Sequence, residues 1–204
     1  MDTYPSMTEL LIHLRPRENY IFHIETRYNS SIKLFAPHGG CIEPCTGVIA
    51  REIAGDRLDY FIFQGIRKRN CFRDLHVTST NYDESQCKEM ATSAMLAVAI
   101  HGRDDEGSFI EIGGGNLELV SELQTHLDAK GYPVRPASYQ RMGQDKRNFI
   151  NLAQQKGVQI ELSAGFRRIL FLDYPRTLQP NPSLLQPFLH TMRLWLDSVQ
   201  SRLA

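Results

Sequence analysis

The stretch that decides the fold is MLAVAIHG, residues 95–102, in which six consecutive apolar residues end abruptly at His101-Gly102. A short, continuous apolar run of this kind is typical of a strand that is buried on both faces. Such strands occur in parallel sheets that helices cover on either side. Residues 95–100 are therefore predicted to form a buried central strand of an α/β domain.

Other apolar segments lie on both sides of this run. Strands are predicted over residues 20–24, 31–36, 58–63, 75–79, 109–112 and 158–162, and helices over residues 42–54, 117–130, 148–156 and 182–203. The alternation indicates an α/β fold with a mixed, largely parallel sheet flanked by helices. A length of 204 residues suits a single domain over 1–204, with core motifs within 20–170 and a closing helix over about 182–203.

The charges of the chain balance, with 23 Lys+Arg against 23 Asp+Glu and a formal net charge of +0. This balance excludes a polybasic arm and an acidic disordered tail, and it argues against a nucleic-acid partner. No stretch approaches the roughly 18 consecutive apolar residues that a membrane-spanning helix requires. The N-terminus shows no signal peptide, so we expect a cytoplasmic protein without a membrane partner.

The chain contains four cysteines, Cys41, Cys45, Cys71 and Cys87. Disulfide frameworks are rare in proteins without a secretory signal, so the four are predicted to be reduced thiols. The first two lie close to His38 and make a His38-Cys41-Cys45 metal set conceivable. The absence of a second cysteine pair argues against that set.

Three ionisable residues, His38, His101 and Glu161, stand at the carboxyl ends of predicted strands. Ligands bind at that edge of open α/β sheets, so these chain-distant side chains are expected to meet in one pocket. The alternative for each histidine is a structural residue that only forms hydrogen bonds.

Glu43 is a fourth candidate, because a loop with two glycines separates it from His38. Paired glycines let the backbone turn tightly enough for both side chains to face one ion. Two histidines and a glutamate bind zinc in many catalytic sites, where water takes the fourth position. His38, Glu43 and His101 are thus candidate zinc ligands, with Glu161 as general base. Alternatively, Glu43 is a carboxylate that stabilises a helix start.

Four motifs occur in the order APHGGCIE (residues 36–43), LHVTST (75–80), IHG (100–102) and GVQIELS (157–163). Together they resemble the phage-type poly-γ-glutamate hydrolase family, some members of which are labelled phage-related replication proteins. The resemblance spans roughly residues 32–167. It implies a zinc-carboxypeptidase-like α/β fold and a zinc-dependent hydrolase of γ-glutamyl amide bonds.

The resemblance also implies roles for individual residues. One zinc ion would be bound by His38, Glu43 and His101, and Glu161 would be the catalytic carboxylate. His76 belongs to the same pattern and is interpreted as a substrate-binding residue that lines the pocket. A histidine buried in the core is the alternative for His76.

Arginines are the remaining candidates. Arg167 follows Glu161 by six positions and is predicted to clamp a substrate carboxylate or an oxyanion. Arg67 and Arg73 belong to a basic run that would suit a polyanionic substrate, although such runs are usually solvated faces. Because the net charge is zero, basic residues are expected to concentrate at the pocket mouth, with acidic residues elsewhere.

These observations predict a zinc amidohydrolase whose partner is a polyanionic γ-glutamyl polymer. Release at host lysis would bring a phage-derived enzyme without a leader to that polymer. One alternative is the same chemistry on another peptide or on an N-acyl amino acid. The other is a non-catalytic phage replication or DNA-associated protein.

Overall fold

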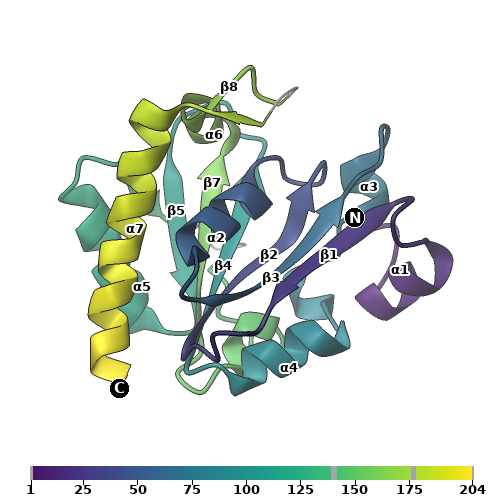
Figure 1. Ribbon diagram of the computed structural model, residues 1–204, viewed down its shortest axis with the longest axis horizontal. Coiled ribbons are helices and arrows are strands. Elements are labelled where there is room, and N and C mark those ends of the chain that lie inside the picture. The colour runs from purple at the N-terminus through teal and green to yellow at the C-terminus, as the bar shows by residue number, and fades with distance from the viewer. Residues whose placement is uncertain (1, 139–141, 176–177, 204) are drawn as a thin grey trace.

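The computed structural model describes residues 2–138, 142–175 and 178–203, and a seven-stranded sheet forms the centre of these residues (Figure 1). The strand order across the sheet is β1-β3-β2-β4-β7-β5-β6. The strands are β1 (Tyr20–Glu25), β2 (Ile32–Gly40), β3 (Asp59–Gly65), β4 (Leu96–Arg103), β5 (Ile110–Gly114), β6 (Val134–Pro136) and β7 (Gly157–Ser163). The four neighbouring strands β3, β2, β4 and β7 run parallel, whereas β1 and β5 pair antiparallel with β3 and β7.

The predicted central strand is confirmed as β4, which lies between β2 and β7. Its side chains alternate between two separate hydrophobic cores. Leu96, Val98 and Ile100 belong to one core, and Ala97 and Ala99 belong to the other. All five residues are fully buried, because helices cover both faces of the sheet.

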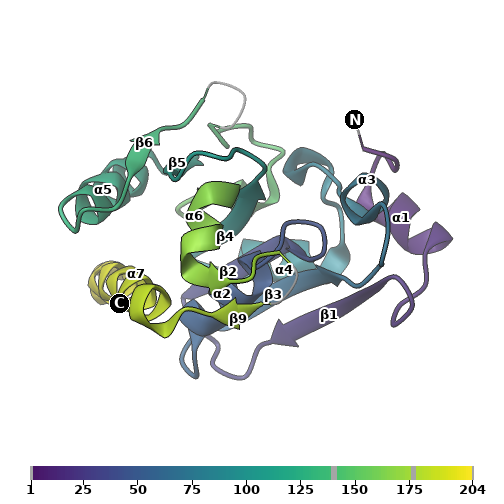
Figure 2. The same ribbon diagram turned by 90° about the horizontal axis from the view of Figure 1, so that it is seen from above.

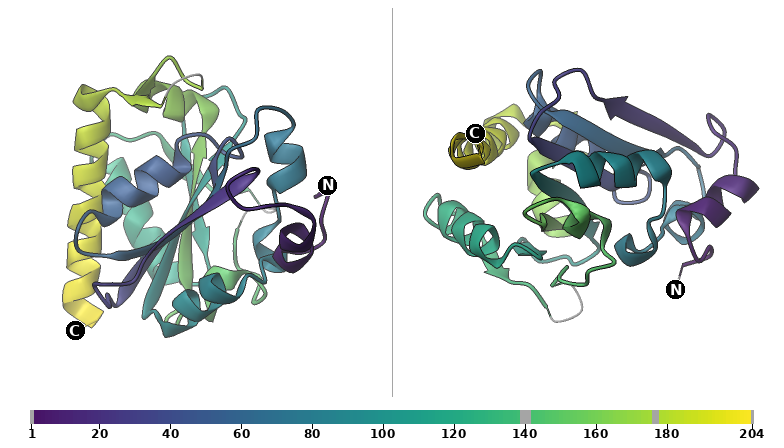
Figure 3. Two further views of the ribbon diagram at one scale, coloured as in Figure 1. Left: turned by 45° about the vertical axis from the view of Figure 1, so that its right-hand side comes forward. Right: turned by 90° about the horizontal axis from the view of Figure 1, so that it is seen from below.

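The helices form a layer on each face (Figure 2). On one face lie α2 (Thr46–Ala54), α5 (Leu117–Asp128), α6 (Ala164–Leu170) and the long α7 (Pro182–Leu203). On the other lie α1 (Met7–His13), α3 (Cys71–Leu75), α4 (Ser85–Ser93) and the 3-10 helix η3 (Phe149–Leu152). A small two-stranded sheet pairs β8 (Phe171–Leu172) with β9 (Gln179–Pro180). The N-terminal segment, residues 2–13, and helix α7 lie on opposite sides of the molecule (Figure 3).

The closing helix is confirmed as α7, and the α/β fold with a mixed, mostly parallel sheet is confirmed as well. Among the described residues, none of the helices has both the length and the apolar character needed to cross a bilayer. The helices α1, α3, α4 and α6 were not predicted from the sequence.

The strand predicted over residues 75–79 is wrong. Helix α3 ends at Leu75, and the 3-10 helix η1 (Ser79–Asn81) begins at Ser79. Between them, the carbonyl of Val77 accepts a hydrogen bond from His38 Nε2 at 2.9 Å. The connection is therefore held to the sheet edge by side chains and not by strand pairing.

Two predicted helices are shorter than expected. Helix α2 begins at Thr46 because Cys45 has a left-handed φ of 79°, which ends any helix running through it. The helix predicted over 148–156 is reduced to the single 3-10 turn of η3, which the Asn148 side chain caps.

The prediction of four reduced thiols is wrong for Cys41 and Cys71, which form a disulfide. The chain leaves β2 at Cys41, whose amide donates to the Gly65 carbonyl at the end of β3. Helix α3 begins beside this point, so the two Cα atoms come within 5.7 Å. Cys45 and Cys87 are buried free thiols, as expected.

Candidate metal centre

The loop after β2 places Glu43 against His38. Gly40 turns the chain with a φ of +67°, and a Cβ there would lie 2.1 Å from the Gly65 carbonyl oxygen, so only glycine fits. The Glu43 amide then donates to the His38 carbonyl at 2.8 Å. As a result, His38 Nδ1 lies 3.0 Å from Glu43 Oε1, and both side chains are buried.

The second oxygen of Glu43 faces strand β4. Oε2 accepts a hydrogen bond from the Gly102 amide at 2.8 Å and lies 3.7 Å from His101 Nδ1. His101 is paired in register with Glu161 on the adjacent parallel strand β7. Glu161 Oε1 accepts a hydrogen bond from Gln159 Nε2 at 3.2 Å. The structure thus brings His38, Glu43, His101 and Glu161 to one edge of the sheet, as the sequence predicted.

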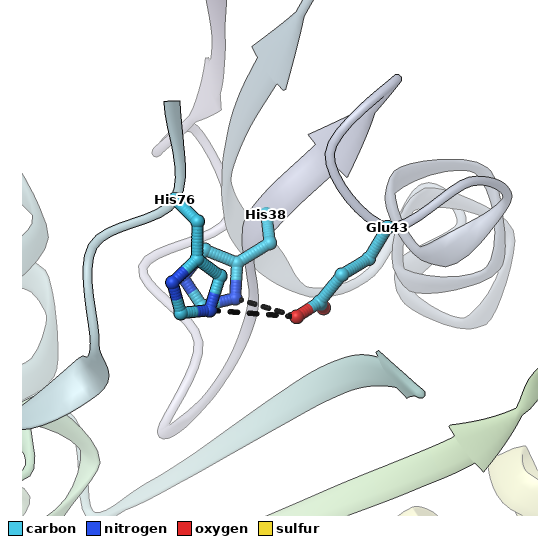
Figure 4. A group of neighbouring side chains, drawn as sticks. All are labelled: His38, Glu43 and His76. Atoms are coloured by element: carbon cyan, nitrogen blue, oxygen red, sulfur yellow. Dashed lines mark ion pairs between the residues drawn. The ribbon is translucent and has the colours of Figure 1, made fainter. Parts of the chain in front are cut away.

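His76 approaches the same carboxylate from the connection after α3 (Figure 4). Its Nε2 lies 3.9 Å from Glu43 Oε1, and its Nδ1 lies 2.7 Å from Asp2 Oδ1. The His76 ring lies 4.2 Å, between centroids, from the His38 ring. Donor atoms of His38, Glu43 and His76 all lie within 4.8 Å of one another and could hold a metal ion.

The hydrogen bonds of His38 and His76 determine which ring nitrogen carries the proton. In each ring, the other nitrogen faces Glu43 with a lone pair. A backbone carbonyl can only accept, so His38 Nε2 must carry the proton that it donates to Val77. His38 Nδ1 is then an acceptor, and it is buried with no hydrogen-bond partner in the described part of the chain. By the same argument, the Asp2 carboxylate fixes the proton of His76 on Nδ1 and leaves Nε2 free. Metal-binding histidines show this arrangement.

The electrostatics favour an ionised Glu43 with a neutral His76. Burial opposes the charge of Glu43, but the neighbouring imidazoles of His38 and His101 outweigh this effect and hold the Glu43 pKa far below its usual range. Burial is also the largest influence on His76 and lowers its pKa to about 4. For His101, burial is outweighed by the Glu43 hydrogen bond and the Glu161 charge, so its pKa is raised.

A cavity of about 1020 Å³ opens over these side chains. His38, Glu43, His76, His101 and Glu161 line it, and the other lining residues include 78–80, 103–105, 142–145, 147 and 148. This volume exceeds a single ion's needs and suits an organic substrate.

The charges of the cavity wall contradict the expected basic mouth. The wall carries Asp104, Asp105 and Asp145 as well as Arg103 and Arg147. Each arginine is paired with an acid, since Arg103 donates to Asp105 and Arg147 donates to Asp145. The prediction that acidic residues lie elsewhere is therefore wrong.

Arg67 and Arg73 are not among the described residues that line the cavity. Both bind the Asp74 carboxylate, with nitrogen–oxygen distances of 2.9 Å for Arg67 and 2.8 Å for Arg73. This shared partner holds the two guanidinium groups beside α3.

Arg167 is fully buried and is also not in the cavity wall. Its Nη1 donates to the Pro44 carbonyl and its Nη2 to the Arg103 carbonyl, both at 2.7 Å. Sequence reasoning placed Arg167 in the turn after β7, but α6 begins there and directs this side chain inward. In the structure, Arg167 holds the backbone behind the site and does not face the substrate space.

Asp2 and Gln159 were missed by the sequence analysis. Gln159 contacts Glu161 and in turn accepts a hydrogen bond from Asn148 Nδ2 at 2.9 Å. Its position two residues before Glu161 on the same strand, hence on the same face, was an available signal. Asp2 lies 74 residues from His76, and no sequence pattern links them.

The fold and the cluster of histidines and glutamates define an α/β protein with a candidate metal site at a sheet edge. The model of the family described as poly-gamma-glutamate hydrolase matches residues 4–189. The chain therefore belongs to the poly-gamma-glutamate hydrolase family, and its membership in this hydrolase family confirms the resemblance seen in the sequence.

Relatives and solved structures agree with this assignment. UPF0714 protein YndL of Bacillus subtilis (strain 168) is 30% identical over 173 residues, which cover 83% of this chain and 67% of YndL. A bacteriophage poly-gamma-glutamate hydrolase structure has a TM-score of 0.90 and 26% identity, covering 98% of this chain and 99% of that one. A zinc-free apo structure of YndL has a TM-score of 0.88 and 27% identity, with coverage of 97% and 98%.

Proposed function

We propose that this protein is a zinc-dependent hydrolase of γ-glutamyl amide bonds and that poly-γ-glutamate is its substrate. The observation that carries the proposal is the buried Nδ1 of His38, which has no hydrogen-bond partner among the described residues and lies 3.0 Å from Glu43 Oε1. A buried acceptor beside an ionised carboxylate is unfavourable without a cation between them. Family membership supports the hydrolase class.

The donor set fits zinc, because imidazole nitrogens and a carboxylate oxygen are ligands that zinc accepts. In the proposal, His38, Glu43 and His101 hold the ion, and His76 lines the substrate space. A bound zinc ion would supply Lewis acidity that polarises a carbonyl oxygen and lowers the pKa of water.

The residues of the chain supply the proton transfers. Glu161 lines the cavity beside His101 and is held by Gln159, so one carboxylate oxygen is fixed while the group faces the reacting space. In the proposed reaction, Glu161 accepts a proton from the attacking water and delivers it to the leaving amine nitrogen. The hydrogen bond from the Gly102 amide fixes the second oxygen of the Glu43 carboxylate, which would be a zinc ligand.

A second candidate is hydrolysis of a shorter or less charged amide, such as a small γ-glutamyl conjugate or an N-acyl amino acid. It is favoured by the acidic residues Asp104, Asp105 and Asp145 in the cavity wall. These carboxylates would repel a long polyanion unless the neighbouring arginines exchange their partners for substrate carboxylates.

The test combines metal analysis with digestion of poly-γ-glutamate and of short amides. We expect about one zinc per chain, loss of activity after chelation, and recovery when zinc is restored. Faster cleavage of the polymer supports poly-γ-glutamate, and cleavage of the short amides alone supports the second candidate. Chelated, metal-free protein that cleaves both classes at the original rate would exclude the zinc mechanism.

Two variants distinguish the ligand sets. His101→Ala should lose most of the bound zinc, whereas His76→Ala should retain it with weaker affinity. The opposite result would assign the third ligand position to His76, whose Nε2 lies in the same cluster of donor atoms.

A further inference from the structure

The carboxylate of Asp2 accepts three hydrogen bonds from the connection that follows α3. Oδ1 binds His76 Nδ1 at 2.7 Å. Oδ2 accepts from the Thr78 amide at 2.7 Å and from the Thr78 hydroxyl at 2.8 Å. One side chain from the N-terminal segment thus fixes both a ring and the backbone beside the candidate metal centre.

The geometry sets the orientation of His76. Its ring lies between those of His38 and Phe72, with centroid distances of 4.2 Å and 4.6 Å. Stacking alone would permit the ring to turn over by 180°, which would put a ring carbon in the place of each nitrogen. The bond to Asp2 removes this freedom, so Nε2 faces Glu43, as Figure 4 shows for His38, Glu43 and His76.

We propose that Asp2 is a positioning residue of the metal centre, and that the N-terminal segment thereby completes the active site. Asp2 holds the proton of His76 on Nδ1 and keeps the lone pair of Nε2 directed at Glu43 Oε1. A carboxylate bound to the outer nitrogen of an imidazole also makes the inner nitrogen a stronger donor. The effect on zinc rests on the function proposed above, whereas the effect on the His76 tautomer does not.

The N-terminal segment has other attachments that do not involve the site. The Thr3 hydroxyl donates to the Arg73 carbonyl at 2.6 Å, and the Thr8 amide donates to Asp83 Oδ1 at 2.8 Å. Met7 is fully buried in the core. Changing Asp2 should therefore leave the segment in place and alter mainly the hydrogen bonds of His76 and Thr78.

These attachments provide a matched control. Asp2→Asn removes the charge but keeps an acceptor oxygen, and Asp2→Ala removes both. Asp83→Asn makes the same change at a carboxylate that binds a backbone amide of the same segment without contacting the metal cluster.

The first measurement is zinc affinity by chelator competition, together with the melting temperature of each metal-free protein. We expect zinc affinity to fall about tenfold in Asp2→Ala and by less in Asp2→Asn. The loss should not exceed that of His76→Ala, because Asp2 acts through His76. Asp83→Asn should retain wild-type affinity even if it melts earlier. Wild-type affinity in Asp2→Ala, or an equal loss of affinity in Asp83→Asn, would overturn the proposal.

The second measurement uses the metal-free protein and is independent of the proposed function. Imidazole nitrogen NMR shifts should show His76 protonated on Nδ1 in wild type, with the Nε2 form gaining population in Asp2→Ala. An unchanged tautomer in Asp2→Ala would overturn the positioning role. If wild type binds no zinc but the tautomer changes as expected, the zinc proposal fails and the positioning of His76 by Asp2 stands.

Discussion

The guanidinium of Arg167 lies against the backbone of Gly102, so closely that a Cβ atom at residue 102 would be 2.7 Å from Cζ of Arg167. On its other side, the amide of Gly102 donates to Glu43 Oε2. Arg167 also binds the carbonyls of Pro44 and Arg103, one residue after Glu43 and two after His101. A buried cation thus joins the two segments that bring Glu43 and His101 together.

Gly102→Ala should disturb the centre without adding any polar group. The new methyl group would collide with the Arg167 guanidinium, so either Arg167 or the end of β4 must move. We expect about 1–3 kcal/mol of destabilisation and about a tenfold loss of zinc affinity. Gly107→Ala is the matched control, because the nearest atoms to a Cβ there are 3.6 Å away. Equal behaviour of the two variants in urea unfolding and zinc titration would contradict this account.

Arg167→Lys should preserve the charge but lose the fork that binds two carbonyls. A lysine ammonium cannot reach both acceptors in the same planar geometry. We expect the free energy of unfolding to fall by about 3 kcal/mol. Arg57→Lys tests an exposed ion pair with Asp197 and should change stability by less than about 1 kcal/mol. Similar losses for both variants in urea titrations would show that Arg167 is not a structural link.

The ion pair between His101 and Glu43 should give the metal-free protein a defined pH dependence. The pKa of His101 is raised above its usual value of 6.5, because the Glu43 hydrogen bond and the Glu161 charge outweigh the effect of burial. The stabilisation from His101 is therefore complete below pH 6.5 and is lost as pH rises through the folded-state pKa. His101→Gln should lack this contribution. The stability difference between wild type and His101→Gln should shrink as pH rises above 6.5, and a difference that grows would contradict the assignment.

Reduction of the Cys41–Cys71 disulfide should lower stability beside the site. The bond closes a loop with a sequence separation of 30 residues, and cross-links of such loops contribute roughly 3 kcal/mol by restricting the unfolded chain. We expect a thiol reductant to lower the melting temperature of wild type. A Cys41→Ser, Cys71→Ser double variant should melt at the lower temperature with or without reductant. A wild-type melting temperature insensitive to complete reduction would argue against a stabilising role.

The parts of the site that the sequence predicted are those set by strand ends. The six consecutive apolar residues at 95–100 predict a buried strand. In the structure this strand is β4, and it runs parallel to its neighbours β2 and β7. Their carboxyl ends therefore meet, and His38, His101 and Glu161 come together. The alternation of strands and helices is enough to predict this meeting, and the pattern of apolar residues reveals that alternation.

The parts that escaped prediction depend on long-range polar contacts. The bond from Asp2 to His76 joins residues 74 positions apart, and apolar periodicity carries no information about it. Arg167 was expected to face the substrate, because it follows Glu161 by only six positions in the sequence. Two backbone carbonyls make its burial possible, and those carbonyls are positioned only once the fold has formed. The acidic residues of the cavity wall, Asp104, Asp105 and Asp145, also come together only in the folded chain.

The most direct test of the central claim is the rate of poly-γ-glutamate cleavage by Glu161→Gln, measured with the zinc content of the same sample. We expect full zinc loading and at least about a 100-fold loss of turnover, because the amide cannot accept the proton of the attacking water. Glu122→Gln, which changes an exposed carboxylate paired with Arg202 on the helical surface, should retain both zinc and activity. Wild-type turnover in zinc-loaded Glu161→Gln would contradict the account.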